Sequence, residues 1–427
     1  MTGAAAAASG VAVDPVPGGE RRYLRQFDLY RAVAYICVVW QHSILWPVPG
    51  GSSVGWSMVM FLHATREVFF ALSAFVVCYS QLLRPQPVWR FWYRRIGALL
   101  VPYLVWTGIY LIYTVVAKPP MTFAHAMTLL VNDLETGYYQ LYFLVVLFQM
   151  LVVIPALLWF LRRPRGHHGK ILGVSVAFQL AMMTVSHYGL FITGSGWHVV
   201  RRLDLDFIMS RDVIGYQLYV VVGALAAMHF GEVQRFVERH WRGMLWVAAA
   251  TFAALEGLYV LGIEIHQTPG HSSDLYQPAV VVWCLAAIGG LTAAGWAWAR
   301  RAARRGAPNR VDRVLRWASD ASGGYYFAHV LVLQIIFTLV AHAGWTQPTD
   351  WGTGSAIIFF GTMVATGALV SLLWRTPLRW VLTGPDRSAE RAAWPAYPVL
   401  GDLAERRRAV ATGPSPTAPT TASAISR

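Results

Sequence analysis

Long apolar segments recur from one end of the chain to the other and constrain its fold more than any other feature. Ten of them approach the roughly 20 residues that an α-helix needs to cross a bilayer. Only 13% of the 427 residues are charged, whereas soluble domains carry about a quarter. The sequence therefore predicts an all-α, polytopic integral membrane protein with about ten transmembrane helices, at residues 27–47, 61–83, 96–117, 138–161, 171–193, 212–230, 244–264, 277–298, 324–344 and 355–382.

Basic residues are distributed unevenly between the two sets of loops. The segments assigned to the cytoplasm carry 29 of the 35 Lys and Arg residues, whereas the outer segments carry only Lys118, Arg201, Arg202 and Arg211. This positive-inside bias, with an even number of spans, predicts that both termini are cytoplasmic. The net charge of +14 is scattered over short loops, which indicates a bilayer with anionic lipid and no nucleic-acid partner.

The two ends of the chain differ in composition from the apolar region between them. Residues 1–22 and 384–427 are rich in small and polar residues and in proline, so we expect tails that are largely disordered. A single membrane domain is then expected at 23–383. The three cysteines all lie inside predicted spans, which predicts neither a disulfide framework nor a zinc site.

The first predicted span contains two ionisable residues, Arg31 and His42, which are eleven positions apart. On an α-helix they lie on one stripe, roughly 20° and roughly 16 Å apart, with Arg31 towards the cytoplasm. Ionisable residues in spans usually face a cavity and are functional candidates. Snorkelling of Arg31 to lipid headgroups and a structural hydrogen bond for His42 are the alternatives. The shared stripe favours a polar groove.

Five motifs follow one another between residues 25 and 333. They read RQFDLYRAVAYICVVWQHS, EVFFALSAFVVCYS, FWYRRIGALLVPYLVW, GYYQLYFLVVLFQMLVVIP and SGGYYFAHVLVL. In this order they resemble the motifs of the membrane-bound acyltransferase-3 family, beginning with a basic residue and a histidine separated by ten residues. The chain departs from the family pattern at Ala98, Gln140 and Tyr142, where arginine, histidine and tryptophan are usual.

The resemblance implies an integral-membrane O-acyltransferase. Members of the family transfer acyl groups, commonly acetyl from acetyl-CoA, to hydroxyls of carbohydrate-containing molecules. We therefore expect acetyl-CoA or another acyl-CoA as donor, and a glycan, glycolipid or glycosylated small molecule as acceptor. We expect no metal, and we expect the protein in the plasma membrane of a bacterium.

Three groups of residues are candidates for this chemistry. Arginine binds phosphates bidentately, so Arg31 and Arg95, with Arg94 assisting, are candidates to hold the polyanionic CoA, although charges at Arg94 and Arg95 also set topology. His42, at the predicted outer end, is the candidate general base. Glu67 is the candidate to fix its tautomer, with pairing to Arg66 as the alternative.

The remaining candidates divide between the two predicted faces. His329, five residues into the predicted ninth span, is expected near the inner face, where it lines the donor channel or is structural. Glu135, Tyr138, Tyr139 and Gln140 are candidates to bind the acceptor, although tyrosines also anchor spans at interfaces. Ser73 is a lower-ranked candidate for an acyl-enzyme nucleophile. The 194–212 segment, with Trp197, Asp204 and Asp206, is a lower-ranked candidate for a lid. A metal site is ranked lower still, because the spacing of its candidate ligands fits no strong metal motif; they are Glu264, His266, His271 and Asp274.

Three other functions are compatible with parts of the sequence. A transporter or flippase for a lipid-linked sugar would also need many spans and buried charge, but no acetyl-CoA. An acyltransferase facing the cytoplasm and modifying a soluble small molecule would share the same motifs. A structural membrane subunit would have no need of the matched polar residues.

Overall fold

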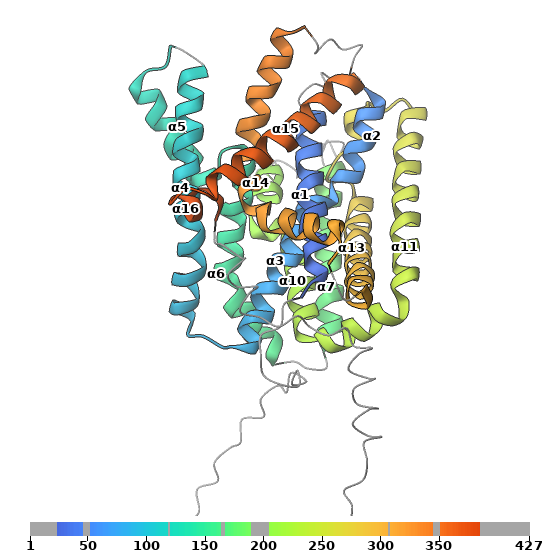
Figure 1. The fold of residues 1–427 in the computed structure, drawn as a ribbon. Coiled ribbons are helices and arrows are strands. Elements are labelled where there is room, and N and C mark those ends of the chain that lie inside the picture. The colour runs from blue at the N-terminus through green and yellow to red at the C-terminus, as the bar shows by residue number, and fades with distance from the viewer. Residues whose placement is uncertain are drawn as a thin grey trace, which may run out of the picture.

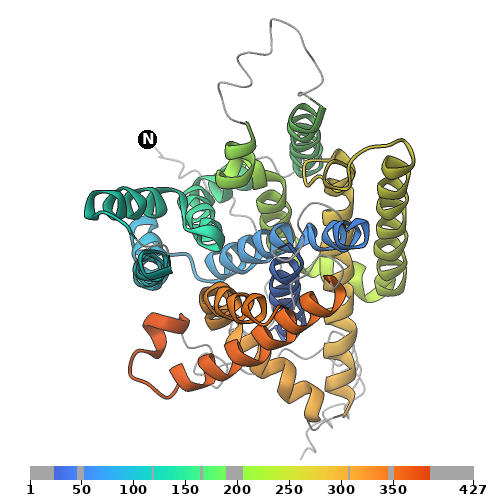
Figure 2. The same ribbon diagram turned by 90° about the horizontal axis from the view of Figure 1, so that it is seen from above.

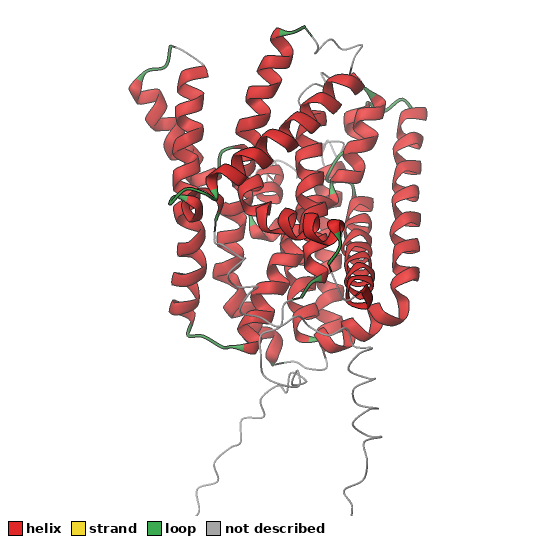
Figure 3. Cartoon of the chain, viewed as in Figure 1, coloured by secondary structure: helices red, strands yellow, loops and turns green. Residues whose placement is uncertain are grey.

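Helices make up the fold of the part of the chain that the structure describes, and no strand occurs there (Figure 3). The all-α prediction is therefore confirmed. The computed structural model describes residues 24–45, 52–117, 120–163, 167–188, 205–305, 308–344 and 351–384. Figure 1 shows the arrangement of these helices.

The helical elements have the following bounds. They are α1 (Gln26–Leu45), α2 (Ser53–Leu62), α3 (Ala64–Leu83), α4 (Val88–Ala117), α5 (Phe123–Thr136), η1 (Tyr139–Leu141), α6 (Tyr142–Arg162), α7 (His168–Tyr188), α9 (Leu205–Arg211), η4 (Val213–Tyr216), α10 (Gln217–Met228), α11 (Phe230–Glu264), α12 (Pro269–Ser272), α13 (Pro278–Arg305), α14 (Arg310–His342), α15 (Trp351–Leu373) and α16 (Arg379–Thr383).

Eight helical segments of the described chain are long and apolar enough to cross a bilayer, which confirms the polytopic membrane class. They are Ser53–Leu83, Val88–Ala117, Phe123–Arg162, His168–Tyr188, Phe230–Glu264, Pro278–Arg305, Arg310–His342 and Gly352–Leu373. Each overlaps one predicted span. The other two predicted spans coincide with α1 and with the shorter apolar stretch Val213–Met228. The count of ten and the cytoplasmic termini remain predictions.

Several helices begin well before the apolar segment that predicted them. α11 starts at Phe230 and α14 at Arg310, whereas the predicted spans start at 244 and 324. The cause is visible at α14, where the side chain of Asn309 accepts from the Asp312 N–H and the Asp312 carboxylate accepts from the Asn309 N–H. This capping box starts the helix in polar sequence, before the hydrophobic stretch begins.

α1 lies near the centre of the bundle, and α5 and α11 lie at opposite margins (Figures 1 and 2). α1 contacts α2, α3, α13, α14 and α15. Beside it, α10 packs along α3. A Cβ on Gly223 of α10 would lie 2.3 Å from the carbonyl oxygen of Ala71, so only glycine allows this close approach, as is common at helix contacts in membranes.

The packing of α1 against α14 joins the first and last motifs of the sequence. The rings of Tyr35 and Tyr325 lie 4.6 Å apart, centre to centre. Around them Ala32, Val39 and Ala321 are buried in one apolar cluster. Residues almost 300 positions apart are thereby brought to one place, and the polar candidates of both motifs follow them.

Candidate active site

His42 lies in the last turn of α1, between two aromatic side chains from distant elements. The imidazole of His329 stacks on it, with ring centres 5.5 Å apart and an angle of 25° between the planes. On another side, the ring of Tyr139 lies 5.1 Å away, and the Tyr139 hydroxyl oxygen is 3.4 Å from Nδ1 of His42. Helices α1 and α14 and the turn before α6 therefore meet at His42.

His329 is held in one tautomer by the backbone of its own helix. Its Nδ1 lies 2.7 Å from the carbonyl oxygen of Tyr325 and 3.0 Å from that of Tyr326. Carbonyl oxygens only accept hydrogen bonds, so Nδ1 carries the proton and Nε2 of the neutral ring has a free lone pair. That Nε2 is buried and has no hydrogen-bond partner among the described residues. Its burial makes an unmet lone pair costly unless a ligand satisfies it.

The expected separation of His329, near the inner face, from His42, near the outer face, is wrong. His329 lies about halfway along α14, which begins at Arg310, and its ring stacks on that of His42. Arg31 and His42 do share the single continuous helix α1, as predicted. The structure therefore groups the two histidines with each other, whereas sequence analysis assigned His329 to the donor end with Arg31.

A strained turn presents Tyr139 to His42. Gly137 has φ +80, and a Cβ there would lie 2.3 Å from the backbone nitrogen of Tyr142. Tyr139 has φ +37, which is rare for a residue with a side chain. Such backbone costs on the order of 1–3 kcal/mol and persists only where the surroundings enforce it, often at functional sites.

Hydrogen bonds fix the rest of this turn to α4 and α14. The Gln140 amide donates to the Tyr110 hydroxyl at 2.6 Å, and the Tyr326 hydroxyl donates to the Gln140 carbonyl oxygen at 2.8 Å. Gln334 of α14 donates to the Tyr138 hydroxyl at 3.1 Å. Gln140 is only 4% exposed, so it anchors the turn and does not face an open site.

Of the four predicted acceptor-binding residues, Tyr139 is the most accessible to a ligand beside His42. Its side chain is 38% exposed. Tyr138 and Gln140 join the network that holds the turn. Glu135 is exposed on α5, and no hydrogen bond or ion pair of the described chain links it to this cluster.

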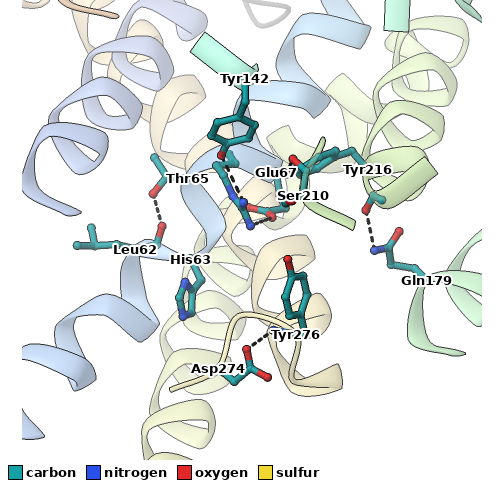
Figure 4. Close-up of polar contacts among 12 residues, drawn as sticks. Leu62, His63, Thr65, Glu67, Tyr142, Gln179, Ser210, Tyr216, Asp274 and Tyr276 are labelled. Atoms are coloured by element: carbon teal, nitrogen blue, oxygen red, sulfur yellow. Dashed lines mark hydrogen bonds and ion pairs between the residues drawn. The ribbon is translucent and has the colours of Figure 1, made fainter. Parts of the chain in front are cut away.

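Glu67 pairs with its neighbour and not with His42. Its Oε1 lies 3.3 Å from Nη2 of Arg66, while Nη1 of Arg66 donates to the Tyr142 hydroxyl at 3.3 Å. Figure 4 shows Glu67 close to Tyr142 and Tyr216. The second carboxylate oxygen is buried without a partner in the described part of the chain. The expected contact between Glu67 and His42 is therefore wrong, and Tyr139 occupies that position.

The arginines proposed for the donor lie on two helices, α1 and α4. Arg95 of α4 donates to the Ser80 hydroxyl at 3.0 Å, and Arg94 is exposed. Arg31 is half-buried on α1, one residue after Tyr30, whose hydroxyl donates to the Val68 carbonyl oxygen. The two arginines therefore lie on different helices, each of which contacts α3.

One pocket lies at the other end of α1 from His42. It is apolar and is lined by Phe27, Tyr30 and Phe75, among other residues of α1, α3, α10, α11 and α13. Neither Arg31 nor His42 lines it.

Among the lower-ranked candidates, Asp274 has a close polar partner. No group of metal-ligating residues occurs in the described ranges. Asp274 accepts a hydrogen bond of 2.6 Å from Nδ1 of His187. Partial burial would raise the pKa of Asp274, but the bonds from His187 and from the Tyr276 N–H lower it below its ordinary value. Trp197 and Asp204, like the side chain of Asp206, lie outside the described residues.

Tyr110 and Gln334 contribute to the site but were missed by sequence reasoning. Tyr110 accepts from Gln140 and donates to the Phe327 carbonyl oxygen at 2.8 Å. Gln334 reaches Tyr138. Both lie within apolar helices, and only their polar atoms at a helix contact could have indicated a role.

A helical membrane bundle that holds two facing imidazoles, one buried and one half-buried, beside a partly exposed tyrosine has the polar groups of a membrane-embedded enzyme. The chain belongs to the acyltransferase-3 family, whose acyltransferase domain matches residues 24–375. The family resemblance of the five motifs is thus confirmed, and the protein is an acyltransferase. No curated protein and no solved structure matches the chain.

Proposed function

We propose that the protein transfers an acyl group, acetyl from acetyl-CoA, to a hydroxyl of a carbohydrate-containing acceptor. The observation that carries the proposal is the stacked pair of His42 and His329, with the free lone pair on Nε2 of His329. Transfer from a thioester to an alcohol needs a base for the hydroxyl proton, and neutral imidazole suits that task at ordinary pH.

His42 is the proposed base, because it is only half-buried and lies beside the partly exposed Tyr139. In direct transfer, the acceptor oxygen attacks the thioester carbon as His42 takes the hydroxyl proton. The carbon–sulfur bond then breaks, and the same proton passes to the leaving thiolate of CoA. The products are the acyl ester and the free thiol, so His42 returns to its starting state.

Tyr139 and His329 are proposed to prepare His42 for this step. If Nε2 of His42 is the basic atom, Nδ1 carries a proton and donates to the Tyr139 hydroxyl, which then fixes the tautomer. His329 lies behind His42 and is 1% exposed. A positive charge on both stacked rings would be strongly repulsive at this distance, so the pair is suited to take up one additional proton at a time.

The remaining candidate residues are assigned to the donor and to the acceptor. Arg31 and Arg95, with Arg94, are proposed to bind the phosphates of CoA, and Tyr139 to contact the acceptor together with Tyr138 and Glu135. Glu67 is proposed to act indirectly, through Arg66 and the Tyr142 hydroxyl. The proposed acceptor is a cell-envelope glycan, a glycolipid or a glycosylated metabolite at a bacterial plasma membrane.

The test compares the acylated molecules of cells that contain and cells that lack the protein. Mass spectrometry of glycans, lipids and secondary metabolites is expected to reveal one acetyl group that is absent without the protein. The purified protein in lipid nanodiscs should then restore it from labelled acetyl-CoA. Movement of a sugar lipid across proteoliposomes, without any acetylation, would contradict the proposal and indicate a transporter.

A further inference from the structure

Arg211, the last residue of α9, reaches away from its own helix to the turn that carries Tyr139. Its Nη1 donates to the carbonyl oxygen of Thr136 and, at 2.9 Å, to that of Gly137. α9 itself lies beside α6 (Figure 2). One guanidinium group therefore binds the two backbone carbonyls where the chain leaves α5 and enters the strained turn.

The same guanidinium group also contacts the far end of the turn. Its central carbon lies 5.4 Å from the centre of the Tyr142 ring, a distance at which a cation and an aromatic face attract each other. Tyr142 is the first residue of α6. Arg211 thus touches the chain on both sides of residues 138–141, the segment that presents Tyr139 to His42.

The backbone of Arg211 is itself fixed to α6. The amide of Gln149 donates to the Arg211 carbonyl oxygen at 3.1 Å and accepts from the Val213 N–H at 2.7 Å. Gln149 lies seven residues after Tyr142, which is two helical turns along the same face. The side chain of Arg211 therefore starts from a point that is held rigidly relative to the turn.

We propose that Arg211 is a positioning residue for acyl transfer, which clamps the turn after α5 so that the Tyr139 hydroxyl stays at His42. The inference rests on the function proposed above. An arginine suits this place because its planar group can bond two carbonyl oxygens and lie over a ring at once. The unfavourable backbone of Tyr139, with φ +37, needs such an external restraint.

Replacing Arg211 should change turnover more than donor binding. In Arg211→Gln we expect kcat to fall by about 10–100-fold, because misplacement by about 1 Å is enough for such a loss. The KM for acetyl-CoA should change by less than about twofold, since no donor group contacts the turn in this scheme. Arg211→Lys keeps the charge but not the planar group that also lies over the Tyr142 ring, and should fall between Gln and wild type.

A matched control and a milder variant accompany these changes. Arg163→Gln removes an exposed arginine at the other end of α6, which lies over Trp159 and does not touch the turn; its kcat should equal that of wild type. Gln149→Ala leaves the bonds from Arg211 to the turn in place but frees the backbone behind them. We expect a smaller loss of kcat, which keeps the proposal testable if Arg211→Gln does not fold.

Hydrogen exchange gives a readout that does not depend on activity. In nanodiscs, the amides of residues 137–142 should exchange faster in Arg211→Gln than in wild type, while Arg163→Gln leaves them unchanged. An active enzyme in which Arg211→Gln alters neither this exchange nor kcat would overturn the clamp. If the amides exchange faster in Arg211→Gln, but the wild-type protein itself transfers no acyl group, the clamp is supported and the proposed function is overturned instead.

Discussion

Replacing Gly137 by alanine tests whether the turn before α6 sets the activity. The residue has φ +80 and ψ 123, which lies outside the left-handed helical region, and such a conformation costs on the order of 1–3 kcal/mol once a Cβ is present. The new Cβ would also lie 2.3, 2.4 and 2.7 Å from three backbone atoms of Leu141 and Tyr142. Backbone atoms cannot rotate away as a side chain does, so the turn itself must move.

The size of this movement follows from the contact distances. Ordinary contact begins at 3.4 Å, which exceeds the shortest distance of 2.3 Å by about 1 Å. A shift of about 1 Å carries the Tyr139 hydroxyl beyond hydrogen-bond reach of His42, from which it is already 3.4 Å away. Misplacement on this scale costs about 100-fold in rate. We expect Gly137→Ala to lose about that factor in kcat.

The assay is transfer of labelled acetyl from acetyl-CoA by purified protein in nanodiscs, together with its thermal unfolding. Gly108→Ala is the matched control, because Gly108 lies within α4 and a Cβ there meets no atom within 4 Å. That variant should keep its activity and gain up to about 1 kcal/mol in stability. If Gly137→Ala retains the turnover of wild type, the turn does not position the site and the reasoning fails.

Two further predictions concern the hydrogen bonds of individual side chains. Tyr139→Phe keeps the ring but removes the hydroxyl that orients His42, so kcat should fall by about tenfold with little change in thermal stability; an unchanged kcat would remove Tyr139 from the mechanism. The pKa of Asp274 is lowered by its bonds from His187 and the Tyr276 N–H. The carboxylate therefore stabilises the fold at pH values above its unfolded pKa of about 3.9. This contribution is lost as the pH falls through the folded pKa. Melting temperatures between pH 6 and pH 3 should therefore decline more steeply in wild type than in Asp274→Asn, and parallel curves would contradict this.

The apolar pattern was sufficient to predict the long apolar helices, but not where they begin and not shorter helices such as α5. Hydrophobic length identifies what can cross a bilayer, and all eight long apolar helices overlap predicted spans. The start of α14 depends instead on a capping box at Asn309 and Asp312, which lies in polar sequence. Missing it shifted the expected start of the helix by about four turns.

The sequence predicted several residues of the candidate site, but not which of them contact one another. Motifs identified His42, His329 and Tyr139, because each is a polar residue in an otherwise apolar segment. Which of them meet depends on helix packing and on the φ of +80 at Gly137, and neither is encoded in residue spacing. Glu67 was assigned to His42 by depth alone, whereas its nearest cation is the adjacent Arg66.

The rate of acyl transfer in His42→Gln, His329→Gln and the double variant tests the central claim most directly. His342→Gln, at an exposed position of the same helix α14, serves as control. Each single change is expected to lower kcat by about 10²–10⁴-fold, and the double change by no more than the worse single one, because the two rings act as a unit. Full activity in His42→Gln, or losses that simply multiply in the double variant, would contradict the account.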